Sequence, residues 1–406
     1  MIVTPLSTVK EFAVRDAVIV GYARTPVGKF GGVFQNRSAV ELGGDAIRGA
    51  LAHANIDADA VDYVAFGHVL QAGLGQITAR QAAVNAGVAL NVPAETINKV
   101  CISSMTALSR ARDLIRLGEC DVVIAGGMES MSRAPYVLDR ARFGLRMGDA
   151  TLVDVMMHDG LTCAFDGVSM GVATENYQQP KGISRAAQDE LAARSHALAH
   201  AAQQRGAFAR EITAVTLPQR RGDDVIVTDD EGIRVDATVA SLGTLRPAFD
   251  PTGTVTAGNA SQISDGAAAL IVTSREHAEK LGVPVLADFT GWATVSGPDP
   301  SLLLQPANAI RAASARLKVD PASFDLYEIN EAFASVVVAS VADLGVSLEG
   351  VNANGGGIAM GHPIGASGAR IVISLINQLT ERGGGTGAAA LCGGGGQGEA
   401  VTVRVG

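Results

Sequence analysis

Short apolar runs alternate with helix-like stretches in two parts of this chain, and a more polar, irregular stretch separates these parts. Near the N-terminus, DAVIVG (16–21) and VDYVAFG (61–67) are predicted strands because β-branched residues dominate them. Residues 39–54 and 101–118 instead carry apolar residues at helical spacing. Such alternation predicts an α/β fold in which helices cover a mostly parallel sheet.

The alternation stops near residue 131 and resumes near residue 263. Between these points the chain holds one long predicted helix, at 184–206, and a charged run at 220–230. A chain of 406 residues exceeds one ordinary core, so separate packed units are expected. The predicted units are an N-terminal half (1–131, continuing at 263–283), an inserted loop domain (132–262) and a C-terminal half (284–406).

Composition argues against several classes of protein. The formal net charge of -9 disfavours a nucleic-acid binder, which normally has a basic excess. No run approaches the roughly 18 apolar residues that cross a membrane. The segment MIVTPLSTVKEF lacks the pattern of a signal peptide, and VTVRVG lacks a Ser-Lys-Leu address. The 4 cysteines form no CxxC pair, so we expect a reducing, cytoplasmic location.

Cys101, in NKVCISSMTAL, stands where a loop turns into a predicted helix. The unpaired N–H groups and partial positive charge of a helix N-terminus favour the thiolate, which is the reactive form of cysteine. On position alone, a buried structural cysteine is as good an interpretation. Cys101 is therefore a candidate nucleophile that needs a partner base.

His362 is a candidate for that base. It lies in NANGGGIAMGHPIGASGAR, where glycines let a substrate approach peptide N–H groups, and a histidine held there can take a proton from a thiol. The alternative is an ordinary polar histidine on a loop. Asn330, at a predicted strand-to-helix junction, can hold a water in an oxyanion hole or simply cap a helix.

Cys392 is a second candidate thiol, at the end of a predicted strand in ALCGGGGQG. It can serve as an acid/base because the pKa of a free thiol, near 8.5, is not far from neutral. The glycines after it do not read as a phosphate loop, since no helix and no Lys-Ser/Thr pair follow. A plain hairpin turn is the structural alternative.

Each of these signals is weak alone, but together they resemble the thiolase family over essentially the whole chain. The matching segments are RTPVGKFGG (24–32), QAGLGQITARQ (71–81), VPAETINKVCISSM (92–105), AGGMESMS (125–132), LRPAFDPTGTVTAGNAS (245–261), SDGAAA (264–269), NEAFA (330–334), NANGGGIAMGHPIGASGAR (352–370) and CGGGGQG (392–398). The resemblance implies two similar βαβαβ-type halves, layered α/β/α/β/α, with an inserted loop domain.

The resemblance also implies an acyltransferase that cleaves 3-ketoacyl-CoA with coenzyme A, or condenses acetyl-CoA to acetoacetyl-CoA in reverse. By position in the family motifs, Cys101 is the nucleophile and His362 its base. Cys392 is the second acid/base, and Asn330 holds an oxyanion-hole water. The backbone N–H groups of Cys101 and Gly394 are expected to form a second oxyanion hole.

Coenzyme A and acyl-CoA are the substrates that the resemblance implies, with no permanently bound cofactor, no metal, and a role in fatty acid metabolism. Coenzyme A is expected to bind the loop domain. A homodimer or homotetramer is expected. The predicted contacts to coenzyme A are Arg234, Ser261, Met170, Ala257 and Phe333.

The chain departs from the family pattern at three places. Ser104 stands where relatives have glycine, and we expect this to alter packing rather than chemistry. Ser169 replaces a common histidine, and Cys163 replaces a usual aspartate. The segment SLLLQPANA (301–309) lacks the Met and both glycines of Met-Gly-x-Gly-Pro. The last two departures bear on the preferred acyl chain length.

A CoA-binding, thiolase-like protein with little or no catalysis is the main alternative, although all four candidate catalytic residues are present. Ketoacyl synthases lack the second cysteine, and a nicotinamide dehydrogenase would show GxGxxG after 16–21. His196 and His200 have a spacing that could hold a metal. Without a third ligand nearby, we expect them on a solvated helix face.

Overall fold

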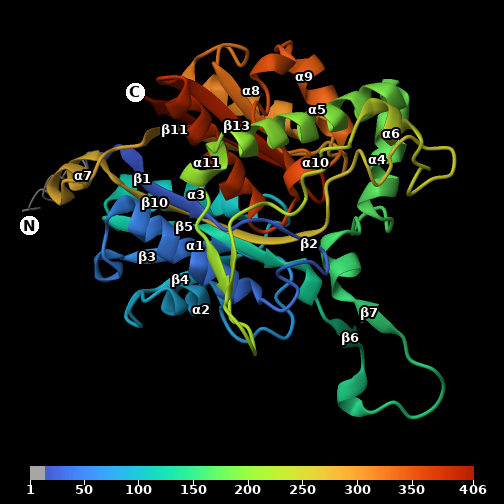
Figure 1. Cartoon of the computed structure of the whole chain (residues 1–406), viewed down its shortest axis with the longest axis horizontal. Helices are drawn as coiled ribbons and strands as arrows, with labels where there is room; N and C mark the ends of the chain where they lie inside the picture. Colours follow the sequence, from blue (N-terminus) through green and yellow to red (C-terminus); the bar gives the residue numbers. More distant parts are fainter. Residues whose placement is uncertain (1–13) are drawn as a thin grey trace, which may run out of the picture.

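The computed structural model describes residues 14–406, which form a rounded body from which a long arm projects (Figure 1). The segment MIVTPLSTVKEF, used above to judge targeting, lies outside the described residues. Within the described part of the chain, no helix is long and apolar enough to cross a membrane. A ten-stranded sheet runs through the body, and the helices are arranged around it.

The N-terminal part of the sheet has the strand order β1-β10-β5-β3-β4. The strand β2 (Gly28–Lys29) adds to the end of β10. The other strands are β1 (Ala17–Arg24), β3 (Tyr63–Gly67), β4 (Ala94–Ile97), β5 (Val122–Ser130) and β10 (Ser264–Ser274).

The C-terminal part repeats this order as β11-β14-β13-β12, with the same sequence of strand directions. Its strands are β11 (Ala287–Ser296), β12 (Leu326–Ile329), β13 (Gly385–Gly393) and β14 (Gln397–Val405). A short antiparallel pairing, in which Val18 faces Asp288, joins the two parts through β1 and β11. The two halves are therefore similar in topology.

The expectation of a mostly parallel sheet was wrong. Only β3 with β4, β3 with β5, and β12 with β13 are parallel pairs in residues 14–406; the other pairs are antiparallel. The chain returns from β5 to β10 through the long insertion and from β13 to β14 through a tight hairpin. Strand β10 therefore begins at the end of the sheet where β5 stops, and β14 begins where β13 stops, which makes both pairs antiparallel.

Helices form three layers around the two parts of the sheet (Figure 1). The central layer is α3 (Ser103–Leu117) against α11 (Ser367–Glu381), which contact strands of both halves. The outer layers are α1 (Ala39–Ala54) with α2 (Thr78–Asn85) on one side, and α8 (Gln305–Leu317) with α9 (Ala334–Leu344) on the other. The predicted α/β/α/β/α layering is confirmed.

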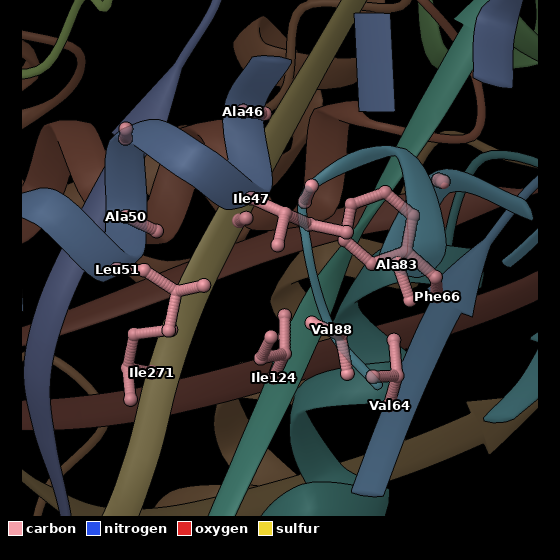
Figure 2. Packing of buried hydrophobic residues seen from close by; sticks show 14 of the residues in the cluster. Ala46, Ile47, Ala50, Leu51, Val64, Phe66, Ala83, Val88, Ile124 and Ile271 are labelled. Atoms are coloured by element: carbon pink, nitrogen blue, oxygen red, sulfur yellow. The ribbon is translucent and has the colours of Figure 1, made fainter. Parts of the chain in front are cut away.

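Helix α1 shows how local sequence places an outer layer. Ser38 and Glu41 form a reciprocal capping box at its start, and Asn55 ends it in a left-handed conformation. Its apolar stripe includes Ile47 and Leu51, which pack on Phe66 and neighbouring strand residues (Figure 2). Full burial of side chains this size stabilises the fold by roughly 1.5–3 kcal/mol each.

Between β5 and β10 the chain makes the irregular structure that the sequence indicated. Its elements are β6 (Tyr136–Leu138), β7 (Leu152–Asp154), α4 (Met170–Gln178), α5 (Arg185–Gln204), β8 (Val215–Leu217), β9 (Val225–Val227) and α6 (Val239–Gly243). The strands β6 and β7 form the projecting arm (Figure 1). The exact limits 132–262 for a separate domain stay a prediction.

Helix α5 corrects the expectation for His196. The helix packs on α9 and on α10 (Gly357–Met360), and His196 is 1% exposed, so it does not lie on a solvated face. Its Nδ1 accepts the backbone N–H of Arg234 at 3.1 Å. The buried face of α5 mixes small alanine and serine side chains with polar Gln188 and Asp189, which gives a weak amphipathic signal. His200 is only half-buried.

Candidate active site

Cys101 lies directly before α3 and lines a cavity of about 470 Å³. The loop that presents it is held by Ser103, whose hydroxyl accepts the Lys99 N–H at 2.8 Å and donates to the Val100 carbonyl at 2.6 Å. Val100 has a φ of 50°, which is unfavourable for a β-branched residue. Such conformations persist where the surroundings fix them, often at functional sites.

Burial raises the pKa of Cys101 to about 12. The N–H groups of Cys101 and Gly394 donate to the sulfur and oppose this rise, whereas the Glu129 carboxylate adds to it. The resting side chain is therefore a neutral thiol. Two backbone donors nevertheless converge on the position of its sulfur, which would stabilise negative charge there.

His362 lines the same cavity and is buried. Burial and then the positive charge of Arg370 lower its pKa to about 3, so the imidazole is neutral. Its Nδ1 lies 2.6 Å from the Ser367 hydroxyl, which itself donates to the Pro363 carbonyl at 3.0 Å. Because the single hydroxyl proton is already used, Nδ1 carries the hydrogen and Nε2 is left as the basic nitrogen.

Asn330 and Cys392 do not line the cavity but lie fully buried behind it. The Asn330 amide nitrogen is 3.4 Å from His362 Nε2 and 3.5 Å from Nδ1. Cys392 is the penultimate residue of β13 and belongs to an apolar cluster with Leu302 and Phe333. Burial raises the pKa of Cys392 far above that of a free thiol, and the nearby Cys101 raises it further.

Most of the other predicted site residues line the cavity. Ser261, Met170, Ala257, Phe333 and Gly394 all line it. Arg234 is not among the lining residues; it is half-buried beside His196 of α5. Its contact with coenzyme A stays a prediction. In residues 14–406, no group of three His, Cys, Asp or Glu side chains could hold a metal ion.

Comparison with known protein families identifies the family to which this chain belongs. The model of the thiolase N-terminal domain matches residues 17–276, and that of the thiolase C-terminal domain matches residues 283–405. The chain belongs to the thiolase family. It is therefore a CoA-dependent acyltransferase, as the resemblance of its motifs implied.

Individual relatives agree over nearly the full length. A probable acetyl-CoA acetyltransferase of Mycobacterium tuberculosis is 51% identical over 390 residues, 96% of this thiolase and 99% of that protein. The acetyl-CoA acetyltransferase of Cupriavidus necator is 47% identical, with 96% and 99% coverage. The crystal structure of the Bacillus anthracis acetyl-CoA acetyltransferase superposes with a TM-score of 0.94 at 39% identity, covering 97% of this chain and all of that one.

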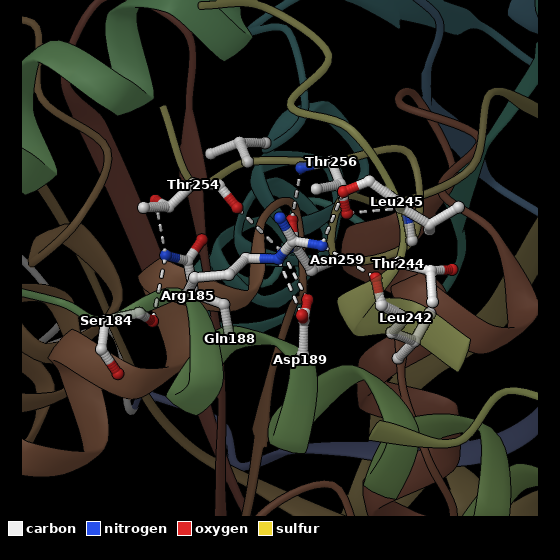
Figure 3. Close-up of polar contacts among 12 residues, drawn as sticks. Ser184, Arg185, Gln188, Asp189, Leu242, Thr244, Leu245, Thr254, Thr256 and Asn259 are labelled. Atoms are coloured by element: carbon white, nitrogen blue, oxygen red, sulfur yellow. Dashed lines mark hydrogen bonds and ion pairs between the residues drawn. The ribbon is translucent and has the colours of Figure 1, made fainter. Parts of the chain in front are cut away.

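A polar network at the start of α5 positions the cavity wall of this thiolase (Figure 3). Asp189 accepts Arg185 Nε at 2.7 Å and Asn259 Nδ2 at 2.9 Å. Arg185 also donates to the carbonyls of Leu242 and Leu245, at 2.8 and 3.0 Å. The network thus ties α5 to the chain on either side of the wall residues Ala248, Phe249 and Ala257, and directly before the wall residues Ala260 and Ser261.

Replacing Asp189 with asparagine is expected to raise the KM for coenzyme A about 10-fold while kcat changes little, because the change loosens the wall and not the thiol–imidazole pair. Steady-state thiolysis at varied coenzyme A checks this. Glu190→Gln, on the exposed side of α5, is the matched control. A fall in kcat with an unchanged KM would contradict the positioning role.

The departures from the family pattern have structural explanations. Ser104 is buried, and its hydroxyl accepts the Ala369 N–H at 3.0 Å, so it caps the first turn of α11 from α3. Ser169 caps α4 by accepting the Val172 N–H, and it lines the cavity. Leu302 also lines the cavity, whereas its neighbour Leu303 packs beside Cys392.

Ser367 and Glu129 contact the candidate site or the loop beside it, although the sequence motifs left them without a role. Glu129 is buried in β5 and accepts the N–H groups of Gly365 at 3.0 Å and Val69 at 3.2 Å. It therefore anchors the loop that follows His362. Its sequence signal is an acidic residue within the mainly small and apolar segment AGGMESMS (125–132). Ser367 had no such signal, since its partner is set by the turn of the loop.

Acid is expected to destabilise this thiolase through two buried histidines. Burial lowers the pKa of His362 to about 3 and that of His196 to about 4, below the ordinary value of about 6.5. Between these values the unfolded chain binds more protons than the folded chain, so stability is lost as the pH falls below about 6.5. At pH 5 the loss for His362 is about 2 kcal/mol.

Urea unfolding of the native chain and of His196→Gln at pH 7 and pH 5 isolates the contribution of His196. Buried carboxyls such as Glu328, whose pKa burial raises to about 8, act with the opposite sign. The decisive quantity is therefore the difference between the two proteins in the free energy of unfolding that each loses from pH 7 to pH 5. The variant should lose less stability between the two pH values, and an equal loss would refute the assignment.

Proposed function

We propose that this thiolase cleaves short 3-ketoacyl-CoA with coenzyme A through an acyl-Cys101 intermediate, and catalyses the reverse condensation of acetyl-CoA. The main support for this proposal is that one mainly apolar cavity is lined by Cys101, by His362 with its basic ring nitrogen, and by Gly394. Asn330 and Cys392 lie directly behind that cavity.

In the first step, His362 Nε2 takes the Cys101 proton as the sulfur attacks the C3 carbonyl of the substrate. The neutral resting pair suits general-base catalysis, since the charges form only as the bond forms. The developing oxyanion lies in one of the two holes, formed by a water on Asn330 with His362, or by the N–H groups of Cys101 and Gly394.

The C2–C3 bond then breaks, leaving the acyl group on Cys101 and the electron pair on C2 of acetyl-CoA. Cys392 donates its proton to C2, and acetyl-CoA leaves. The high pKa of Cys392 matches this task, because a strongly basic carbanion needs only a weak acid close by. The thioester enolate uses whichever of the two oxyanion holes the first oxyanion did not occupy.

Deacylation reverses the first half of the reaction. The thiol of coenzyme A loses its proton to the Cys392 thiolate, attacks the acyl thioester and forms a shortened acyl-CoA. Cys101 leaves as a thiolate and recovers the proton held on His362. Both side chains return to their resting forms, and no redox step occurs.

The proposed preference is for short, straight acyl groups. On the side of the cavity next to Cys101, Met131 and Ile364 belong to a packed apolar cluster that contacts Cys101. A cavity of about 470 Å³ must also admit the pantetheine arm of coenzyme A, which leaves little volume for the acyl chain. Relatives named acetyl-CoA acetyltransferases fit this class of substrate.

The test is CoA-dependent cleavage of acetoacetyl-CoA and of 3-ketodecanoyl-CoA by the native chain. We expect turnover of acetoacetyl-CoA with kcat/KM at least about 10-fold higher than for the longer substrate, because even one methylene that a hydrophobic pocket cannot accept lowers kcat/KM by about this factor. The reverse ratio would overturn the short-chain assignment. Binding of coenzyme A with cleavage of neither substrate would favour the non-catalytic alternative.

We also propose an oligomeric state, a metabolic role and a cellular compartment for this thiolase. The arm carries exposed apolar side chains, with Phe143 88% and Met147 99% exposed, which suits burial in a homodimer or homotetramer. Sedimentation of the native chain and of Phe143→Asp/Met147→Asp tests this, and a native monomer would contradict it. Chemistry of this kind belongs to fatty acid metabolism, and reactive thiols suit a reducing cytoplasm.

A further inference from the structure

The buried guanidinium of Arg370 lies behind the candidate active site and has had no role in the proposed steps. It is on the first turn of α11 and is 1% exposed. A charge in an apolar interior is costly unless partners satisfy it, so the groups that face this side chain matter.

Arg370 is poorly satisfied. Its Nη1 lies 3.7 Å from a carboxylate oxygen of Glu328, which is beyond hydrogen-bond distance. Among the described residues, neither Nε nor Nη1 has a hydrogen-bond partner. The remaining nitrogen, Nη2, donates to Asn330 Oδ1 at 3.4 Å. The hydrogen bond that this guanidinium makes is therefore directed at a residue of the candidate site.

This contact decides which way the Asn330 amide points. A guanidinium has donors only, so the amide must present its oxygen to Arg370 and its NH₂ group to the opposite side. The NH₂ nitrogen lies 3.4 Å from the basic Nε2 of His362 and 3.5 Å from Nδ1. Because the NH₂ group has two N–H donors, Nε2 takes at most one of them, and the other stays available for a water or an oxyanion in the site.

We propose that Arg370 is a positioning residue for acyl transfer: its guanidinium holds the Asn330 amide with the NH₂ group toward the reacting atoms. The nearby cation also polarises the amide, which makes its N–H a stronger donor. The same charge opposes protonation of His362 and so keeps that imidazole in its basic form. This inference rests on the proposed function of the site.

The test uses Arg370→Gln, whose side chain can accept as well as donate and which therefore no longer fixes the amide. We expect kcat for acetoacetyl-CoA thiolysis to fall about 10²-fold, the scale of losing one oxyanion-hole donor, while KM changes less than about 3-fold. Arg370→Lys keeps a charged, donor-only group and is expected to stay within about 10-fold of the native kcat. Arg382→Met, at the exposed end of α11, is the matched control.

A double-mutant cycle separates positioning from general loss of structure. If Arg370 acts through Asn330, then Asn330→Ala and Asn330→Ala/Arg370→Gln will have kcat values within about 3-fold of each other. Multiplicative losses in the double variant, or a folded Arg370→Gln with native kcat, overturn the proposal. Should Arg370→Gln not fold, a folded Arg370→Lys as slow as Asn330→Ala overturns it equally. An inactive native chain would instead refute the proposed function itself.

Discussion

Replacing Cys101 with alanine is expected to lower acetoacetyl-CoA thiolysis by about 10⁴-fold or more, since the covalent route is lost and only binding and the oxyanion holes remain. Among the described residues, Cys101 is the cysteine that lines the cavity, so it is the thiol placed to attack a substrate bound there. The variant should still bind coenzyme A. Loss of substrate absorbance and the intact mass of the acylated protein are the measurements.

Cys120→Ala is the control for this result, because Cys120 is half-buried at the far end of α3 and remote from the cavity. It should turn over and acylate as the native chain does. Acylation that persists in Cys101→Ala would place the nucleophile elsewhere. A loss of activity in both variants would point to general damage.

Replacing Cys392 with alanine should separate the two halves of the reaction. Exchange of an acetyl group between acetyl-CoA and labelled coenzyme A needs no proton at C2, so we expect it to continue at a reduced rate. Carbon–carbon cleavage and condensation need that proton and should fall by about 10³-fold, within the usual range for a lost acid/base. Isotope exchange and thiolysis, measured on one preparation, give the comparison.

His362→Asn is the matched variant, since it removes the base that the acylation step requires. Both exchange and thiolysis should then fall together. If Cys392→Ala also loses both to the same extent, the division of labour between the two thiols is wrong. Equal retention of both activities would show that another group protonates C2.

Much of the local structure could be predicted from the sequence. The helix predicted at 39–54 from its apolar spacing matches α1, and the structure shows that Ser38, Glu41 and Asn55 fix its ends. The helix expected at 101–118 is observed as Ser103–Leu117, so Cys101 does precede it. The glycines after Cys392 form a hairpin turn, which was the structural alternative to any phosphate loop.

Other features depended on contacts that no local pattern encodes. The direction of β10 and β14 follows from how the chain returns to the sheet, and the burial of His196 follows from the packing of α5 on the C-terminal half. The apolar lining near Cys101 joins Met131 to Ile364, which are far apart in the sequence. Residue spacing within one element carries no information about such pairs.

The sequence by itself determined the elements, the family and the candidate nucleophile, because caps, periodicity and motifs are local properties of the chain. Only the tertiary structure decided which nitrogen of His362 is basic, since that depends on the Ser367 hydroxyl and its own acceptor. It also decided the orientation of Asn330, through the buried cation of Arg370. Protonation and hydrogen-bond direction are set by neighbours in space, which folding supplies.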